Sequence, residues 1–261
     1  MIMGIVNVTP DSFSDGGRYN DTSRAIAHAL DLKAQGADIL DIGGESTRPG
    51  ADEVPIDVEL SRVLPVIDGL RSCGLPLSID TRKPEVMRAA IAAGVDMVND
   101  ICGLSAPGAL DAVLQSRVAI CLMHMQGTPQ TMQASPEYRG VVAEVSDYLG
   151  ERLRVCLEAG ISKSRLIIDP GFCFGKRLDH NLDLLRGLSA FSTLDVPVLV
   201  GLSRKSMLGQ ITGRDVTDRK SASLAAALLA AQAGAAIIRV HDVAETRDTL
   251  AVWQAVTGSE K

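Results

Sequence analysis

Eight short apolar runs alternate with longer helical patterns along this chain, and that alternation limits the possible folds more than any other feature. The runs cover Ile2–Val8, Asp38–Ile42, Leu75–Ile79, Met97–Asn99, Val118–Met123, Leu166–Ile168, Val196–Val200 and Ala236–Val240. They are apolar almost throughout rather than at every second residue, which is typical of parallel strands buried on both faces. Eight such strands, each followed by a helix, predict a (β/α)₈ TIM barrel of class α/β.

The segments between the runs have helical patterns. We expect helices over Asp21–Gln35, Val58–Arg71, Pro84–Ala93, Gly108–Gln115, Glu137–Ala159, Asn181–Phe191, Asp218–Ala233 and Thr246–Val256, with a short helix over Ser206–Gln210. A doubly wound open sheet shows the same alternation and is the alternative fold. The count of eight units and the length favour a barrel, with residues 1–261 forming one domain.

Composition excludes several classes of partner. The formal net charge is −6 and only 3% of residues are aromatic, which argues against nucleic-acid binding. The most apolar stretch, Leu224–Ile238, is shorter than the ~20 residues of a membrane-spanning helix, and Met1–Val6 carries no basic leader. The five cysteines are odd in number and form no C-x-x-C pair, so we expect reduced thiols in a cytoplasmic protein.

Polar side chains stand at the carboxyl ends of nearly all the apolar runs. In chain order they are Asn7, Asp41, Glu45, Asp80, Asn99, Asp100, His124, Asp169, Ser203, Arg204, Lys205, Arg239 and His241. One such residue is commonly a cap or a turn residue. A full ring of them indicates the catalytic mouth of a barrel, which lies at the carboxyl ends of the strands.

The last run suggests an anion site. Arg239 and His241 are two residues apart, so both side chains face the same cleft. Arginine presents a planar fork to phosphate oxygens, histidine adds a further donor, and barrels bind phosphate near the loops after strands seven and eight. Together with Arg204 and Lys205 these residues form a local positive cluster. The alternative for Arg239 is an ion pair with Asp242 or with Glu245 of the following helix.

Six segments carry a resemblance to a known family. They are Asn7–Gly17, Gly43–Gly50, Ser78–Thr81, Asp169–Lys176, Gly201–Ser206 and Arg239–Asp242. In this order they resemble the motifs of the dihydropteroate synthases, pterin-binding barrel enzymes, over essentially the whole chain. The resemblance implies a transferase of folate biosynthesis that joins 6-hydroxymethyl-7,8-dihydropterin diphosphate to 4-aminobenzoate, releasing 7,8-dihydropteroate and diphosphate. It also implies a homodimer.

The resemblance further implies roles for individual residues. Asp80, Asn99, Asp169 and Lys205 match the family's contacts to the pterin ring, whose adjacent N–H and amine donors suit a carboxylate. Asn7 matches its Mg²⁺ ligand, and Ser206 stands where the family holds the benzoate carboxylate. The loops Thr9–Gly17 and Glu45–Ala51 match lids whose residues Phe13, Thr47, Arg48 and Pro49 complete the aminobenzoate and diphosphate surroundings.

A largely dissociative substitution follows from the chemistry of that substrate, because loss of diphosphate leaves a cation stabilised by the electron-rich ring. We expect Mg²⁺, Arg239 and His241 to stabilise the departing charge, and Asp80 and Asp169 to stabilise the cationic ring. Asp80, Lys205, Arg239 and His241 are the expected catalytic residues. Three alternative hypotheses for the function are a Schiff-base aldolase that uses Lys205, a pterin-binding methyltransferase module and a non-catalytic pterin binder.

Overall fold

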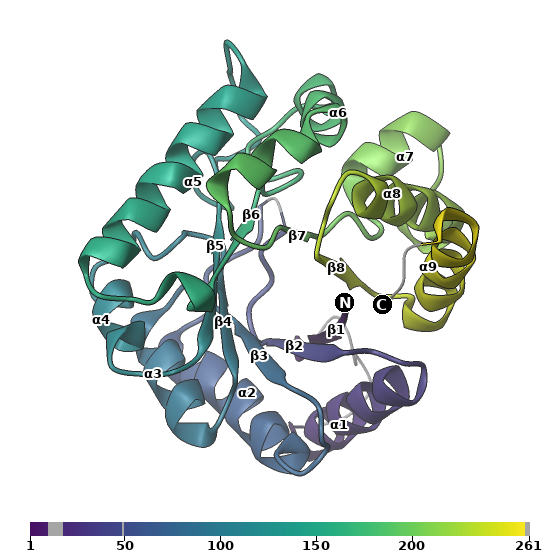
Figure 1. The fold of residues 1–261 in the computed structure, drawn as a ribbon. Helices are drawn as coiled ribbons and strands as arrows, with labels where there is room; N and C mark the ends of the chain where they lie inside the picture. Colours follow the sequence, from purple (N-terminus) through teal and green to yellow (C-terminus); the bar gives the residue numbers. More distant parts are fainter. Residues whose placement is uncertain (10–17, 49, 259–261) are drawn as a thin grey trace.

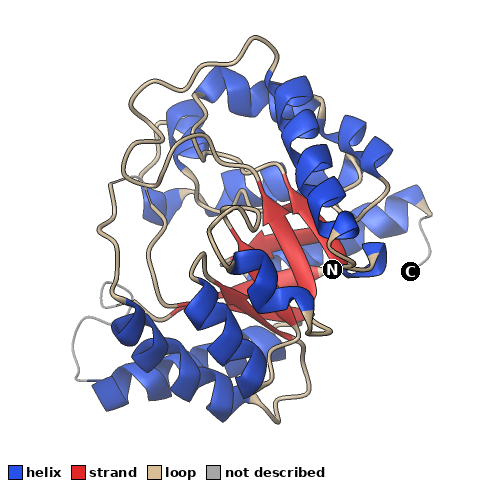
Figure 2. Ribbon diagram, turned by 90° about the vertical axis from the view of Figure 1, so that its left-hand side faces the viewer, coloured by secondary structure: helices blue, strands red, loops and turns tan. Residues whose placement is uncertain are grey.

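Eight parallel strands form the centre of the molecule and helices surround them (Figures 1 and 2). The computed structural model describes residues 1–9, 18–48 and 50–258. The strands are β1 (Ile2–Asn7), β2 (Ile39–Gly43), β3 (Leu77–Asp80), β4 (Met97–Asp100), β5 (Ala119–Met123), β6 (Leu166–Asp169), β7 (Leu199–Val200) and β8 (Ile237–Val240). Each lies on one of the eight apolar runs.

The strands join into a nearly closed barrel. Their order in the sheet is β6-β5-β4-β3-β2-β1-β8-β7, and an isolated parallel bridge between Ile168 and Val198 connects the two ends. The Ile168 N–H also donates to Pro197 O at 3.0 Å. Because the two end strands meet, the barrel prediction is confirmed and the open-sheet alternative is wrong.

The helices pack outside the barrel. They are α1 (Arg18–Ala34), α2 (Ile56–Leu70), α3 (Pro84–Ala93), α4 (Ala109–Leu114), α5 (Val141–Glu158), α6 (Leu178–Arg186), α7 (Ser206–Thr212), α8 (Lys220–Gln232) and α9 (Val243–Thr257). Short 3₁₀ turns cover η2 (Lys163–Arg165), η3 (Leu188–Leu194) and η4 (Val216–Asp218). In the described part of the chain, no helix combines the length and apolarity needed to cross a bilayer.

Most expected elements differ from the observed ones by one to three residues at their ends, and three differ for a visible physical reason. The helix expected from Glu137 begins at Val141, because the Glu144 carboxylate accepts the N–H groups of Arg139 and Gly140 at 2.7 and 2.8 Å. The helix expected over residues 181–191 ends at Arg186, and a 3₁₀ turn follows Gly187. The strand expected over residues 196–200 is reduced to two residues, since Pro197 has no N–H for the ladder.

The barrel interior has an apolar base and a polar layer above it. The base is a cluster of buried side chains: Met3, Ile39, Met97, Cys121, Leu199 and Ile237. Asp41, Asn99 and Arg239 each follow a member of this base by two residues, so they point inward one layer nearer the carboxyl ends. A larger apolar cluster fills the space between the sheet and the helices. The inward charged side chains Asp41, Asp80 and Arg239 thus lie toward the carboxyl ends of the strands.

We expect Met3→Ala to lower the free energy of unfolding by about 2–5 kcal/mol in urea titrations, because Met3 is fully buried in the base and its truncation leaves a cavity. Leu30→Ala on α1 is the matched control, since Leu30 is 44% exposed. Equal losses in the two variants would contradict a tightly packed barrel base.

Candidate active site

An arginine between two carboxylates occupies the centre of the polar layer. Arg239 on β8 donates from Nε to Asp41 Oδ2 at 2.6 Å and from Nη2 to Asp80 Oδ2 at 2.7 Å. Asn99 Nδ2 donates to the same Asp41 oxygen at 3.2 Å. The alternative partners suggested for Arg239, Asp242 and Glu245, are therefore wrong: its carboxylates come from β2 and β3, which β1 separates from β8 in the sheet.

Burial and the charges of neighbouring groups shift the pKa values of Asp80 and Arg239 in opposite directions. Burial is the largest influence on Asp80 and raises its pKa to about 7; Arg239 opposes this, while Asp41 adds to it. Burial alone would lower the pKa of Arg239, but the charges of Asp41 and Asp80 raise it above its usual value. The guanidinium is therefore charged, and Asp80 titrates near neutral pH in the ligand-free site.

Asp169 and Lys205 lie beside this centre. Asp169 Oδ1 accepts the Gly171 N–H at 2.7 Å, and burial raises the pKa of Asp169 against the opposing charge of Lys205. Lys205 Nζ donates to Phe172 O at 2.7 Å and lies 4.7 Å from the centroid of the Phe174 ring. Burial lowers the pKa of Lys205, and the charges of Asp169, Asp80 and Arg239 also act on it. The four residues assigned to a pterin ring, with Asn99 included, therefore gather at one barrel end.

His241 is neutral in this structure. Burial is the main cause that lowers its pKa to about 3, and the charges of Arg239, Arg204 and Arg48 act in the same direction. The His241 backbone N–H donates to Ser203 Oγ at 3.2 Å, so the serine hydroxyl is free to donate to Nδ1, 3.0 Å away. With Nδ1 as the acceptor, the ring proton is on Nε2, which makes that nitrogen a donor without any positive charge.

The expected positive cluster is smaller than the sequence suggests. Arg204 binds Asp242 through two hydrogen bonds of 3.1 and 2.6 Å, and His241 carries no charge. Arg204 is therefore paired with Asp242, and of the four expected residues Arg239 and Lys205 are the cations beside the carboxylates of the polar layer.

The remaining expected residues lie around the rim. Asn7 ends β1 and pairs in register with Gly43, and its side-chain amide has no hydrogen-bond partner among the described residues. Ser206 is the exposed first residue of α7. Thr47 and Arg48 lie in the loop after β2, where the Gly50 N–H donates to Pro129 O at 3.1 Å. Phe13 and Pro49 fall outside the described residues.

A metal ion would need few protein ligands here. Among residues 1–9, 18–48 and 50–258, no three His, Cys, Asp or Glu side chains are grouped as a metal site. Mg²⁺ commonly keeps several waters and binds substrate phosphate oxygens beside one or two protein ligands. The unpartnered amide of Asn7 fits that kind of site and does not fit an ion held by protein alone.

Sequence reasoning missed a buried network that anchors the loop after β2. Glu59 on α2 accepts from Thr81 Oγ1 at 2.6 Å and from Lys83 Nζ at 2.7 Å. Lys83 also bridges to Glu45 at 3.2 Å, and Arg82 bonds the same carboxylate. Glu59 lies in the first turn of a helix, where acidic residues are common, so its sequence position gave no signal.

Lys176 is a second missed group. It is 2% exposed, and its Nζ lies 2.9 Å from His124 Nδ1, 2.9 Å from Gly171 O and 3.0 Å from Phe174 O. Gly171 has a φ of +71°, and a Cβ there would lie 1.9 Å from His124 O, so the loops after β5 and β6 touch through backbone. Burial lowers the pKa of Lys176 to about 7.

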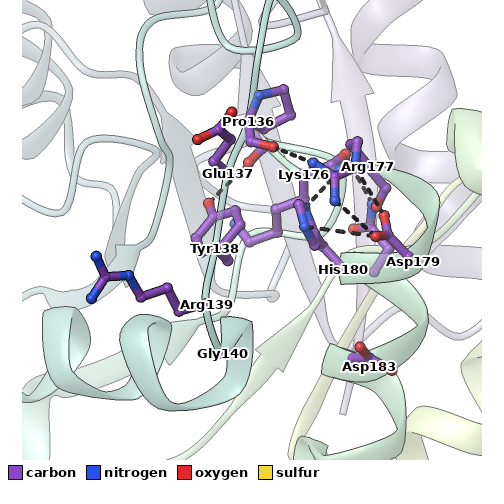
Figure 3. Close-up of polar contacts among 12 residues, drawn as sticks. Pro136, Glu137, Tyr138, Arg139, Gly140, Lys176, Arg177, Asp179, His180 and Asp183 are labelled. Atoms are coloured by element: carbon purple, nitrogen blue, oxygen red, sulfur yellow. Dashed lines mark hydrogen bonds and ion pairs between the residues drawn. The ribbon is translucent and has the colours of Figure 1, made fainter.

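Contacts further along the same two loops reinforce this junction. Figure 3 shows Arg177 between Pro136 and Asp179; Arg177 donates to Pro136 O at 2.8 Å. Tyr138 packs edge-on against the ring of His180 at 4.9 Å, and its hydroxyl donates to Gly175 O at 2.9 Å. The loop after β6, which contacts Asp169 and Lys205, is therefore held by the loop after β5 and by the start of α6.

Comparisons with known proteins agree with this geometry. Residues 3–241 match the family described as pterin binding enzyme. The dihydropteroate synthase of Escherichia coli (strain K12) is 49% identical over 261 residues, which cover 100% of this chain and 93% of that protein.

Two solved structures are similar throughout. A Xanthomonas albilineans dihydropteroate synthase with 4-aminobenzoic acid has a TM-score of 0.94 and 56% identity over 99% of this chain and 93% of that one. A Burkholderia cenocepacia dihydropteroate synthase complexed with 7,8-dihydropteroate has a TM-score of 0.90 and 49% identity, covering 99% of this chain and 91% of that one.

The buried Lys176 predicts a pH-dependent stability difference. Its pKa is about 7 in the folded protein and about 10.4 in an unfolded chain, so the unfolded state binds more protons between these values. The free energy of unfolding contributed by this group therefore rises with pH. We expect the wild type minus Lys176→Met difference in unfolding free energy, from urea titrations, to increase between pH 7 and pH 10.

Tyr138→Phe is the matched control. It removes the bond to Gly175 O from the same pair of loops, but burial raises the pKa of Tyr138 and keeps it protonated across this range. Its difference from wild type should stay flat from pH 7 to about pH 9 and then fall slightly toward pH 10, where the unfolded tyrosine begins to ionise, opposite in sign to the lysine effect. A flat difference for Lys176→Met as well would show that the lysine does not titrate as the structure implies.

Proposed function

This chain belongs to the family of pterin-binding enzymes, and we propose that it is a dihydropteroate synthase. The amine of 4-aminobenzoate forms a C–N bond with the methylene carbon of 6-hydroxymethyl-7,8-dihydropterin diphosphate. The C–O bond to diphosphate breaks, its electron pair leaves with the diphosphate, and the amine loses a proton. The observation that carries the proposal is the gathering of Asp80, Asp169, Lys205 and Arg239 at one barrel end.

Carboxylate and amide groups recognise the pterin. Asp169 is a buried carboxylate with one oxygen on the Gly171 N–H, which leaves the other for the adjacent N–H and amine donors of the ring. Asn99 supplies a donor and an acceptor, and Lys205 donates toward the ring carbonyl. This division of donors and acceptors suits a flat, neutral heterocycle.

The same residues support a largely dissociative substitution. As diphosphate leaves, positive charge spreads over the dihydropterin ring, and the ionised Asp80 carboxylate stabilises it in a buried site where such interactions are strong. Arg239 and the Nε2–H of His241 donate to the leaving diphosphate oxygens. Each group therefore acts most strongly on charge that develops during the reaction.

We propose Mg²⁺ as the cofactor, with Asn7 as its protein ligand. The Asn7 amide, which has no hydrogen-bond partner within the part of the chain that the structure describes, supports this assignment, as does the weak demand of Mg²⁺ for protein ligands when phosphate oxygens are present. When bound, the ion would neutralise charge on the diphosphate.

The second substrate belongs at the rim. Ser206 begins α7, and the N-terminus of a helix favours a carboxylate such as that of 4-aminobenzoate. Thr47 and Arg48 of the loop after β2 complete the surroundings of the two substrates, and we assign Phe13 and Pro49 to the same role from the family resemblance.

We further propose a homodimer formed through α8 and α9. Leu229 is 52% exposed, Val252 66% and Val256 81%, and these two helices pack beside one another. Helix α8 is apolar around most of its circumference, which is unusual for a helix that faces solvent.

The cytoplasm is the proposed location, because all five cysteines are free thiols.

Release of diphosphate from the pterin ester tests the proposed function directly. We expect release that depends on both 4-aminobenzoate and Mg²⁺, with 7,8-dihydropteroate appearing in equal amount by chromatography. Release that is indifferent to the aminobenzoate would contradict the synthase, and folate binding without turnover would favour the methyltransferase module or the non-catalytic binder.

Lys205→Ala should reduce kcat/KM for the pterin diphosphate by about 10²-fold or more while the protein stays folded, because the ring loses a positioned donor. Lys163→Ala is the matched control, since Lys163 forms an exposed ion pair with Asp195 far from the site. A Lys205→Ala enzyme with full activity would refute the role given to this lysine.

The proposed dimer is tested by light scattering coupled to size exclusion. We expect Leu229→Glu combined with Val252→Glu to reduce the molar mass from that of two chains to that of one, because charges would be buried in the interface. Leu157→Glu on α5, at a site 43% exposed, should leave the dimer intact. A single-chain mass for the wild type would exclude the dimer.

A further inference from the structure

We propose that Asp41 is a positioning residue: one of its carboxylate oxygens orients both Arg239 and Asn99 for the substrate. This inference deepens the proposed function, on which it rests. Asp41 lies within β2, in a run that is otherwise apolar, and was given no role among the substrate contacts. Its side chain is fully buried, so it acts through its neighbours rather than at the rim.

The contacts of Asp41 fix the plane of the guanidinium. Asp41 Oδ2 accepts from Arg239 Nε, the nitrogen nearest the aliphatic stem, at 2.6 Å. The bond at Nε and the bond from Nη2 to Asp80 at 2.7 Å together fix the plane of the guanidinium. Nη1 has no partner among the described residues. This terminal nitrogen is therefore available to a leaving anion.

The same oxygen aligns the pterin side of the site. Asn99 Nδ2 donates to Asp41 Oδ2 at 3.2 Å, which turns the Asn99 carbonyl oxygen away from Asp41. One buried atom thus connects the residue assigned to diphosphate with a residue assigned to the ring. A displacement of Asp41 would disturb both together.

Stability alone does not explain a carboxylate at this position. Asp41 Oδ1 is buried and has no hydrogen-bond partner among the described residues, and Ser78, its register partner on β3, has a buried hydroxyl in the same condition. A buried polar atom without a partner is unfavourable, and buried ion pairs are often no more stable than apolar replacements. The negative charge of Asp41 is better explained by its role in orienting Arg239.

Asp41 also influences the titration of Asp80. The charged groups that act on Asp80 are Arg239, which lowers its pKa, and Asp41, Glu59 and Asp100, which raise it together with burial; Lys205 and the Cys121 thiol also face this carboxyl. Asp41→Asn removes one of the raising charges. The pKa of Asp80 should therefore fall in the variant, an effect that a packing role would not produce.

The test compares Asp41→Asn with Ser78→Ala, a matched change in the same buried layer that removes no charge. In the variant Asp41→Asn we expect a folded protein whose kcat/KM for the pterin diphosphate is about 10–100-fold lower, the usual loss on mutating a residue that orients a ligand-binding group. Because the reaction uses ionised Asp80, kcat/KM should rise with pH, and the midpoint of that rise should move to lower pH in Asp41→Asn. Ser78→Ala should stay within about threefold of wild type, with an unmoved midpoint.

Wild-type activity with an unmoved midpoint in Asp41→Asn overturns the proposal, as do equal losses in both variants without a shift. If Asp41→Asn does not fold, a second measurement on the wild-type protein still tests the proposal. In wild-type protein labelled with ¹⁵N, the arginine Nε–H signal that disappears in Arg239→Lys should be protected from exchange, and it should persist when inorganic diphosphate is added.

Rapid exchange of that signal would contradict the Asp41 contact. This spectrum requires no turnover, so it separates a failure of the inference from a failure of the proposed function. An inactive wild type with a protected Nε–H would reject the synthase and retain the arrangement of Asp41 and Arg239.

Discussion

The ion pairs of Arg239 inside the barrel are the constraint on which the site depends. Two carboxylates, the fully buried Asp41 and the largely buried Asp80, face one guanidinium. Without the arginine the carboxylates would repel one another, and without them a buried cation would be unfavourable. The three side chains come from β2, β3 and β8, with β1 between β2 and β8, and the curvature of this part of the sheet turns them toward one another. The ion pairs therefore depend on the curvature of the barrel wall.

The polar layer suits a substrate in which positive and negative charge separate during the reaction. A departing diphosphate leaves a cationic ring behind, and the site offers carboxylates to the ring and donors to the diphosphate. Asp80 stands between these roles: it binds Arg239 in the ligand-free protein and titrates near neutrality. A diphosphate that attracts Arg239 would release Asp80 toward the pterin. The two halves of the substrate thus assist each other's recognition.

Much of this arrangement could be predicted from the sequence, and the failures have physical causes. Apolar runs at regular intervals predict the barrel, because strands buried on both faces leave that pattern. Polar residues at the strand ends predict the location of the site. The partners of Arg239 were not predictable, since Asp41 and Asp80 lie 198 and 159 residues away along the chain. Asp41 gave one signal, a lone charge within an apolar strand, which placed it in the ring of polar residues but did not identify Arg239 and Asn99 as its partners.

The shortness of β7 has a dynamic consequence. This strand has two residues, because Pro197 removes a donor, and it meets β6 through one bridge at Ile168. The barrel wall therefore has a seam, and the least protected region of a fold opens most readily. Asp169 and Lys205 stand on opposite sides of this seam. Local opening of the barrel wall at this seam would change the distance between Asp169 and Lys205. Thermal motion of the wall is therefore coupled to how tightly these two residues bind the pterin ring.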